Sequence, residues 1–245
     1  MDEPAPRRIL LKLSGGYLGD RGLPLDRGRL DRVAAQLVPL IGRGVGVGLV
    51  TGGGNVLRGG SDQALGFPRT SLDRMGMMVT VVNGLALAEA LAAAGLRAGV
   101  FSTFPVGLEG IHPFSSEAVD ALLEEGGVPV FAGGTGLPFF STDTAAVIRG
   151  LQIRADLLVK GSRVDGIYDR DPERHPGAQR FDRIDSREVI ERGLEVMDQA
   201  AFALARRHRL PIVVLDIATP GILAALLDGT AVCTRVEHAE EEDHG

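Results

Sequence analysis

Four glycine-rich loops in this 245-residue chain each come directly after a short run of apolar residues. Their sequences are KLSGG at 12–16, TGGGNVLRGG at 51–60, AGGTGLP at 132–138 and KGSRVDG at 160–166. A short apolar run that ends in glycine is typical of a buried strand entering a tight loop. Glycine also lets backbone N–H groups turn toward an anion at close range. Four such loops along one sheet edge would favour a ligand with several phosphates.

Strand and helix patterns alternate along the whole chain. The predicted strands span 8–13, 45–51, 97–103, 128–132, 156–160, 211–215 and 230–235. The predicted helices span 27–43, 71–94, 116–125, 143–154, 187–193, 196–208 and 219–228, with Asp26, Ser71, Ser115, Ser141 or Thr142, and Ser186 as N-caps. This alternation predicts an α/β fold with a mainly parallel sheet, helices on both faces, and ligands beyond the carboxyl ends of the strands. The stretch 161–185 is the longest that we expect to be irregular.

Composition and charge exclude several classes of protein. With 44% hydrophobic residues, 24% charged residues and one cysteine, the chain is unlike collagen, a disulfide-stapled scaffold or a disordered chain, and we expect one domain over 1–245. Five of the 32 acidic residues lie in 237–245, expected to be a disordered tail, so 27 acids face 26 bases in the rest. That balance predicts no nucleic-acid partner.

The sequence also predicts a cytoplasmic protein without a membrane partner. The longest stretch free of Asp, Glu, Lys and Arg, at 126–142, is only 17 residues and contains two prolines, so we expect no membrane span. The first residues, MDEPAPRR, do not resemble a secretory signal. The single cysteine, Cys233, cannot form an internal disulfide, which fits a reducing compartment.

Only two of the 26 basic residues are lysines, Lys12 and Lys160, and both close an apolar run. A compact ammonium on a flexible stem can follow a phosphoryl group as it moves. We expect Lys12 beside the transferred group, Arg58 on an acceptor phosphate, and Asp143 orienting Lys12 or a magnesium ion. The alternatives are a plain helix N-cap for Asp143 and a solvated loop arginine for Arg58. Neither G-x-x-x-x-G-K-[ST] nor G-x-G-x-x-G occurs, which excludes ordinary P-loop and dinucleotide sites.

Six collinear motifs carry a resemblance to a known family. They are KLSG, GGGNVLRG, DRMGMMVTVVNGLAL from Asp73, GTGLPFFSTDTAA from Gly134, VDGIYDRDP from Val164 and VMDQAAFALARRHRLPI from Val196. Together they resemble the bacterial UMP kinases of the amino acid kinase family. The resemblance implies a three-layer α/β/α sandwich with a mainly parallel central sheet, ATP and UMP as substrates, Mg²⁺ bound with ATP, and a homohexamer. It also implies GTP or UTP as effectors, with a response near the loop 20–25.

The resemblance assigns roles residue by residue. It implies catalytic roles for Lys12, Arg58 and Asp143. It implies ATP binding by Lys12, Leu13, Ser14, Gly15, Gly54, Arg58, Lys160, Ser162, Tyr168 and Asp171. It implies UMP binding by Gly53, Asp73, Thr135, Gly136, Leu137, Pro138, Phe139, Phe140, Ser141 and Thr142. The chain departs from the family where it has Gly16 in place of Glu and Leu137 in place of Asn, and Leu137 places pyrimidine discrimination in question.

Two other functions stay open at this stage. The chain could be a kinase of the same fold that phosphorylates a carboxylate or carbamate, or a nucleotide-binding regulator without catalysis. For the UMP reaction, a phosphate oxygen attacks the γ-phosphorus of ATP in line, so positioning and charge neutralisation matter and no general base is needed. The apolar helix expected at 71–94 predicts burial between layers or against a second subunit, in a hexamer or at least a dimer.

Overall fold

The computed structural model describes residues 5–19, 22–57, 65–194 and 196–238. Within this part of the chain, nine strands form one sheet in the order β4-β3-β5-β2-β1-β6-β10-β11-β9, and every neighbouring pair except β10–β11 is parallel. Its strands are β1 (Arg8–Leu13), β2 (Gly46–Thr51), β3 (Ala98–Ser102), β4 (Ile111–Pro113), β5 (Val128–Ala132), β6 (Leu157–Ser162), β9 (Arg183–Asp185), β10 (Ile212–Asp216) and β11 (Thr234–Glu237). A separate antiparallel hairpin pairs β7 (Ile167–Tyr168) with β8 (Arg180–Phe181).

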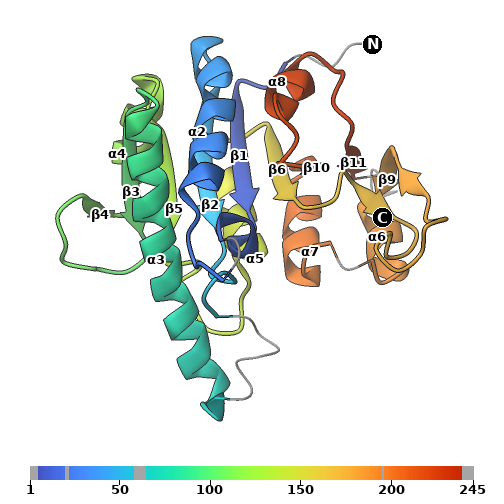
Figure 1. Cartoon of the computed structure of the whole chain (residues 1–245), viewed down its shortest axis with the longest axis horizontal. Helices are drawn as coiled ribbons and strands as arrows, with labels where there is room; N and C mark the ends of the chain where they lie inside the picture. The colour runs from blue at the N-terminus through green and yellow to red at the C-terminus, as the bar shows by residue number, and fades with distance from the viewer. Residues whose placement is uncertain (1–4, 20–21, 58–64, 195, 239–245) are drawn as a thin grey trace, which may run out of the picture.

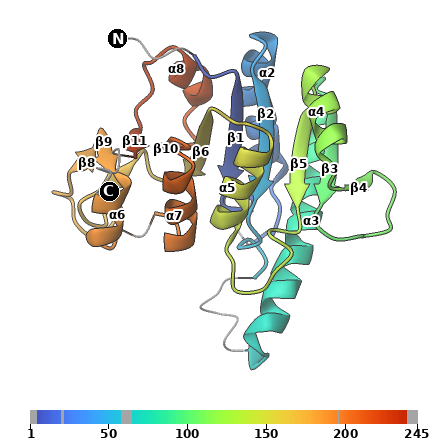
Figure 2. The same cartoon turned by 180° about the vertical axis from the view of Figure 1, so that it is seen from behind.

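Helices cover both faces of the sheet, as Figures 1 and 2 show from opposite sides. The helices are α1 (Gly15–Leu18), α2 (Arg27–Gly42), α3 (Arg69–Ala93), α4 (Ser116–Glu124), α5 (Thr142–Gln152), α6 (Ser186–Glu191), α7 (Gln199–Arg207) and α8 (Ile222–Leu227). Alternate residues of β1 enter two separate cores: Leu11 packs with α2, α3 and α8, and Leu10 packs with α4, α5 and α7. The period of two in a strand produces this division. The predicted α/β fold with three layers is confirmed.

Most predicted helix starts follow from capping chemistry. Asp26, Ser115 and Ser141 accept backbone N–H bonds at the starts of α2, α4 and α5, as predicted. The predictions of Ser71 and Ser186 as caps are wrong. Helix α3 begins two residues earlier, after Pro68, whose ring fixes φ at −56°, and Asp185 caps α6. These differences stay within the usual uncertainty of helix ends.

Three other predictions need correction. The stretch 161–185 contains β7, β8 and β9, whose two or three residues are too short to show a period. The last strand is Thr234–Glu237, so the prediction of 230–235 is displaced and Glu237 belongs to the sheet. The helix predicted from 196 begins at Gln199, where Asp198 accepts the N–H of Ala201 at 2.9 Å. The short strand β4 was not predicted.

Helix α3 is long and apolar enough to cross a membrane by length and composition alone, with a mean hydropathy of 1.6 over 18 residues. The prediction made from the sequence is that no segment spans a membrane, and length and composition alone do not test it. Its inner face nevertheless packs on β3 and β5, and Gly84 lies where an added Cβ would be 3.4 Å from Val100. The outer face leaves Met75, Met78 and Val82 between 40% and 53% exposed. This is the arrangement of a core helix with one uncovered apolar side.

Candidate functional site

The glycine loops meet at one edge of the sheet because they follow β5, β2, β1 and β6, which are neighbours in that order. The register places Lys12 of β1 directly beside Lys160 of β6. Since all four strands are parallel, their carboxyl ends and the loops that follow them share this edge. The sequence expectation about the placement of the loops is thus confirmed.

Lys12, Asp143 and Lys160 form a nearly buried group of charges, which we call the lysine cluster. Lys12 Nζ lies 2.7 Å from Asp143 Oδ1, and Lys160 Nζ lies 3.1 Å from Asp143 Oδ2. The three side chains are between 8% and 13% exposed. Asp143 is the second residue of α5, whose cap is Ser141, so the interpretation of Asp143 as a plain N-cap is wrong.

The charges of the lysine cluster set its protonation. Burial disfavours ionisation of Asp143, but the charges of Lys12 and Lys160 outweigh burial and hold the pKa of the carboxyl below its ordinary value. Burial lowers the pKa of Lys160, and Asp143 opposes this shift. With all three groups ionised, one positive charge remains uncompensated, so the cluster is suited to an anionic ligand.

Close backbone contacts explain the glycines around the lysine cluster. A Cβ on Gly15 would meet the carbonyl oxygen of Gly52 and lie 2.5 Å from the nitrogen of Gly54. A Cβ on Gly53 would lie 2.8 Å from the carbonyl oxygen of Gly76 in α3. The loops after β1 and β2 therefore interlock through backbone that only glycine allows.

Two asparagines that the sequence analysis did not select hold the loop after β2. Asn83 of α3 is fully buried and donates to the carbonyl of Gly52 at 2.8 Å. Its amide exchanges hydrogen bonds of 2.8 and 2.9 Å with Asn55, which also donates to the carbonyl of Pro24. The sequence did contain a signal for Asn83, because it is an asparagine inside the apolar run of 71–94. A buried amide needs hydrogen-bond partners, so such a residue is expected to hold a neighbouring segment.

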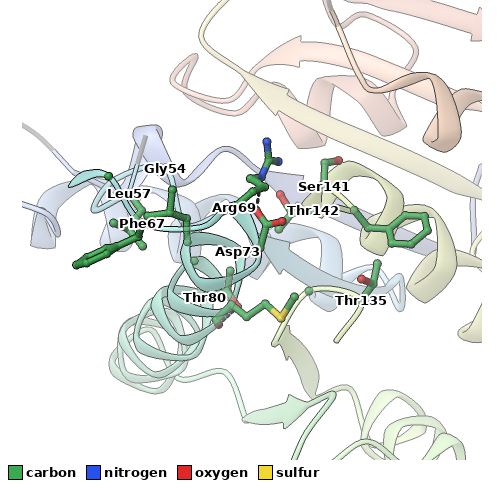
Figure 3. A pocket seen from close by; sticks show the side chains of 16 residues that line it. Gly54, Leu57, Phe67, Arg69, Asp73, Thr80, Thr135, Ser141 and Thr142 are labelled. Carbon is green, nitrogen blue, oxygen red and sulfur yellow. Dashed lines mark hydrogen bonds and ion pairs between the residues drawn. The ribbon is translucent and has the colours of Figure 1, made fainter. Parts of the chain in front are cut away.

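A cavity of about 760 Å³ opens between the loop after β2, the first half of α3 and the segment that leads into α5 (Figure 3). We call it the α3 cavity. Among the residues assigned to UMP, those that line it are Gly53, Asp73, Thr135, Phe140, Ser141 and Thr142. Gly136, Leu137, Pro138 and Phe139 are not part of its lining, and Leu137 is 58% exposed. Gly54, assigned to ATP, also lines this cavity.

Asp73 is held by two donors on the wall of the α3 cavity. Arg69 Nε lies 2.7 Å from Oδ1, and the backbone N–H of Phe139 donates to Oδ2 at 2.8 Å. The Asp73 side chain is 16% exposed. Sequence reasoning selected Asp73 but not Arg69, which also lines the cavity.

A second cavity of about 560 Å³, the hairpin cavity, lies at the β7–β8 hairpin and the residues that follow α6. It is lined by three residues assigned to ATP, namely Ser162, Tyr168 and Asp171. The hydroxyl of Tyr168 donates to Asp165 at 2.6 Å, and this bond raises the pKa of the tyrosine. The predicted purpose of the stretch 161–185, a ligand site, has a cavity to support it.

The lysine cluster connects the two cavities. Lys160 donates to the backbone carbonyl of Val196, which lines the hairpin cavity. Asp143 donates its N–H at 2.9 Å to Ser141, which lines the α3 cavity. Asp198, which the sequence analysis did not select, accepts from Ser141 and Thr144 and so joins α7 to the start of α5. Its signal was an aspartate close to the start of the helix predicted at 196–208.

Two further expectations concern Arg58 and metal ligands. Arg58 lies outside the described residues. In the described ranges, no group of three or more His, Cys, Asp or Glu side chains could hold a metal ion. Because both oxygens of Asp143 face ammonium groups, the structure favours its role in orienting lysines.

Comparisons with known proteins agree on one family. The model of the amino acid kinase family matches residues 7–216. The uridylate kinase of Pseudoalteromonas atlantica is 44% identical over 98% of this chain and 97% of its own length, and that of Brucella abortus is 46% identical over 96% and 98%. The crystal structure of UMP kinase from Bacillus anthracis superposes with a TM-score of 0.91 at 29% identity, covering 97% of this chain and 98% of its own.

Proposed function

This chain belongs to the amino acid kinase family, and from that membership we propose that it transfers the γ-phosphoryl group of ATP to UMP, which gives UDP and ADP. It is a nucleoside monophosphate kinase, as its uridylate kinase relatives at 44–46% identity indicate. The observation that carries the proposal is the lysine cluster between two separate cavities. Two nucleotides that exchange a phosphoryl group need two pockets joined at a positively charged point.

We place UMP in the α3 cavity. Asp73 would accept hydrogen bonds from the ribose hydroxyls, and the segment 135–142 would surround the uracil. The glycine loops after β1 and β2 would direct backbone N–H groups at the phosphate. The cavity of about 760 Å³ falls in the range usual for small-molecule sites.

We place ATP with its adenosine in the hairpin cavity, at Ser162, Tyr168 and Asp171. Its phosphates would run toward Lys12, Ser14 and the glycine loops. Leu13 ends β1 beside these groups, and Gly15 keeps the loops close together. The donor and acceptor phosphates then meet at the lysine cluster.

The reaction brings two anions together, and Lys12 would stabilise the charge on the moving phosphoryl group. Asp143 holds Lys12 and Lys160 in place rather than taking a proton, since the phosphate of UMP is already ionised. Its lowered pKa keeps it ionised at neutral pH. Arg58, from the loop after β2, would contact the acceptor phosphate.

Magnesium would arrive with ATP. No cluster of metal-ligating side chains is present in the described ranges, and Asp143 is occupied by two lysines, so the phosphates of ATP and water would hold the ion. When bound there, magnesium would supply positive charge to the phosphates. The chain's own contribution is the lysine cluster and the backbone N–H groups.

The assembly and regulation are also proposals. The exposed side chains of Met75, Met78 and Val82 on α3 support a contact with a second subunit within a hexamer. For a response to GTP or UTP, the support is that Asn55 donates to the carbonyl of Pro24, which links the loop expected to respond with the loop after β2. The single half-buried Cys233 fits a cytoplasmic location.

The carboxylate or carbamate kinase is the other enzymatic candidate. Its substrates are small, and the α3 cavity of about 760 Å³ with Asp73 on its wall supports a nucleotide acceptor instead. A regulator without catalysis would have no need for two buried lysines on one carboxylate, because such groups are costly to bury.

A coupled assay of ADP formation tests the proposal. ATP and magnesium are supplied with UMP, CMP, dUMP or TMP, and separately with aspartate, acetylglutamate or carbamate. We expect UMP to give a kcat/KM at least about tenfold above that of CMP and no turnover with the carboxylates or carbamate. Turnover that is fastest with a carboxylate or carbamate would reject the proposal, and binding of UMP without turnover would favour the regulator.

A further inference from the structure

Arg69 is placed where it gives little to the helix that contains it. It is the first residue of α3, at the positive end of the helix dipole, where a cation is unfavourable. Its partner Asp73 follows four residues later, and the order of base before acid is the weaker one for a helical pair. A side chain with two local disadvantages is better explained by what it contacts in the cavity.

The Arg69 side chain faces the α3 cavity. It lines the cavity and is 68% exposed, while its Nε lies 2.7 Å from Asp73 Oδ1. Figure 3 shows its guanidinium in view between Gly54 and Ser141, above Asp73. The charge of Arg69 therefore stands against an acidic side chain on the wall of a cavity that we assign to an anionic ligand.

Phe139 supplies the second donor to Asp73 from an unusual backbone conformation. Its φ is 71°, the left-handed region that residues other than glycine rarely adopt. Phe139 is 69% exposed, so packing of its side chain does not account for this conformation. The conformation instead accompanies an N–H that donates to Asp73 Oδ2 at 2.8 Å across 66 positions of the sequence.

The number of remaining acceptor sites on Asp73 matches a ribose. An ionised carboxylate offers about four acceptor sites, and Arg69 and Phe139 use one on each oxygen. About two sites remain, one for each of the 2′ and 3′ hydroxyls of a ribonucleotide. A 2′-deoxyribonucleotide would leave one of them without a donor, which is unfavourable in a partly buried site.

We propose that Arg69 is a positioning residue for ribose recognition, which orients and neutralises Asp73 and thereby sets the preference for a ribonucleotide over a 2′-deoxyribonucleotide. This rests on the proposed function, because it takes the α3 cavity as the UMP site. Without Arg69, the Asp73 carboxylate could rotate away from the orientation in which it accepts from both ribose hydroxyls.

The test compares UMP with dUMP in Arg69→Met, Arg69→Lys and a control, Arg74→Gln. Arg74 lies on the same helix beside Asp73 but is exposed and does not line the α3 cavity. For Arg69→Met we expect kcat/KM for UMP to fall about tenfold through KM, and that for dUMP to fall less than about threefold. Arg69→Lys restores part of the UMP preference because an ammonium can still pair with Asp73. Arg74→Gln leaves both nucleotides unchanged.

Calorimetric titration of the same variants with UMP and dUMP provides a readout that does not need turnover. If Arg69→Met lost equal affinity for UMP and for dUMP, the inference would be overturned. Equal losses would show that Arg69 contacts the phosphate, which both nucleotides share. A fall in kcat alone would also overturn it. If the wild-type chain binds UMP more tightly than dUMP but does not phosphorylate it, the proposed function fails and ribose recognition stands. Thermal unfolding of Arg69→Met should match that of Arg74→Gln.

Discussion

The α3 cavity is walled by a 25-residue helix and by strand ends of the central sheet, whereas the hairpin cavity is walled mainly by turns around two-residue strands. Near the α3 cavity, Thr80 and Asn83 are almost completely buried and bond to the loops after β5 and β2. At the hairpin cavity, the ion pairs of Asp169 with Arg170 and of Asp171 with Arg174 are exposed to water.

This difference indicates how tightly the residues around each cavity are held. Contacts among buried backbone and amide groups allow few alternatives, because an unpaired buried group is costly. Exposed ion pairs contribute little to stability and can exchange with solvent. We therefore expect substitutions near the α3 cavity to lower the free energy of unfolding. Substitutions at the hairpin cavity should instead change mainly the affinity for ATP.

The sharpest test of this comparison uses Gly15, which packs against the loop after β2 beside the α3 cavity, and a glycine of the hairpin loop. In Gly15→Ala, the new Cβ would meet the backbone of Gly52 and Gly54, and we expect a loss of about 3 kcal/mol in the free energy of unfolding. Gly177, in the loop of the β7–β8 hairpin, has nothing within 4 Å of an added Cβ. Gly177→Ala should leave stability unchanged to within about 0.5 kcal/mol. Denaturant titration measures both, and similar losses would contradict the comparison.

Lys12→Ala tests the lysine cluster, which is linked to both cavities by hydrogen bonds. We expect kcat to fall on the order of a hundredfold, with much less change in UMP affinity, because the ammonium acts on charge that develops during transfer. Steady-state kinetics and UMP titration measure the two quantities. A variant with near-normal kcat would remove Lys12 from the catalytic assignment.

Asp143→Asn tests the electrostatics of the lysine cluster. We expect it to lower the free energy of unfolding by about 2 kcal/mol at neutral pH, because two buried lysines lose their counter-charge. The lowered pKa of Asp143 means that its contribution is full above its unfolded pKa of about 4 and is lost as pH falls through the folded pKa.

The difference between wild type and Asp143→Asn should therefore shrink as the pH is lowered below about 4. The pKa of Lys160 is also lowered, so its unfavourable contribution to stability is full below its folded pKa and is lost as pH rises toward its unfolded pKa. Urea titrations at several acidic pH values give the difference. A constant difference across this range would show that Asp143 is not held ionised by the two lysines.

Tyr168→Phe probes the hairpin cavity. We expect KM for ATP to rise about fivefold, because Tyr168 lines the hairpin cavity and loses a part-buried bond to Asp165 worth about 1 kcal/mol. KM for UMP and stability should change little. Tyr17→Phe is a matched control, since the buried Tyr17 hydroxyl has no hydrogen-bond partner within the described ranges. A loss of folding stability in Tyr168→Phe, absent from the control, would contradict the difference between the regions.

The smallest effect is expected for Leu137→Asn. Leu137 is 58% exposed and does not line the α3 cavity. We therefore expect the backbone groups and hydroxyls of the segment 135–142 to recognise the base. We expect the ratio of kcat/KM for UMP and CMP to change less than about threefold. A change of tenfold or more would place the side chain at position 137 in contact with the base.

Local patterns predicted much of the molecule. The apolar runs that became β1, β2, β5 and β6, and the glycines that follow them, are visible within a few residues of sequence. Capping by Asp26 and Ser115 is equally local. The prediction of the strand at 230–235 was displaced and β7, β8 and β9 were missed, because such short segments gain their structure from partners rather than from their own period.

For the candidate site, too, some features could be predicted from the sequence and others could not. The sequence by itself determined the residue types of the chemistry, since Lys12, Lys160, Asp143 and Asp73 could be selected before any fold was known. Only the tertiary structure decided that one carboxylate holds both lysines, that Asn83 holds the loop after β2, and that Arg69 and Phe139 orient Asp73. The physical reason is that hydrogen bonds and ion pairs depend on distances of about 3 Å between atoms. Folding alone brings together positions such as Asp73 and Phe139, which lie 66 residues apart in the chain.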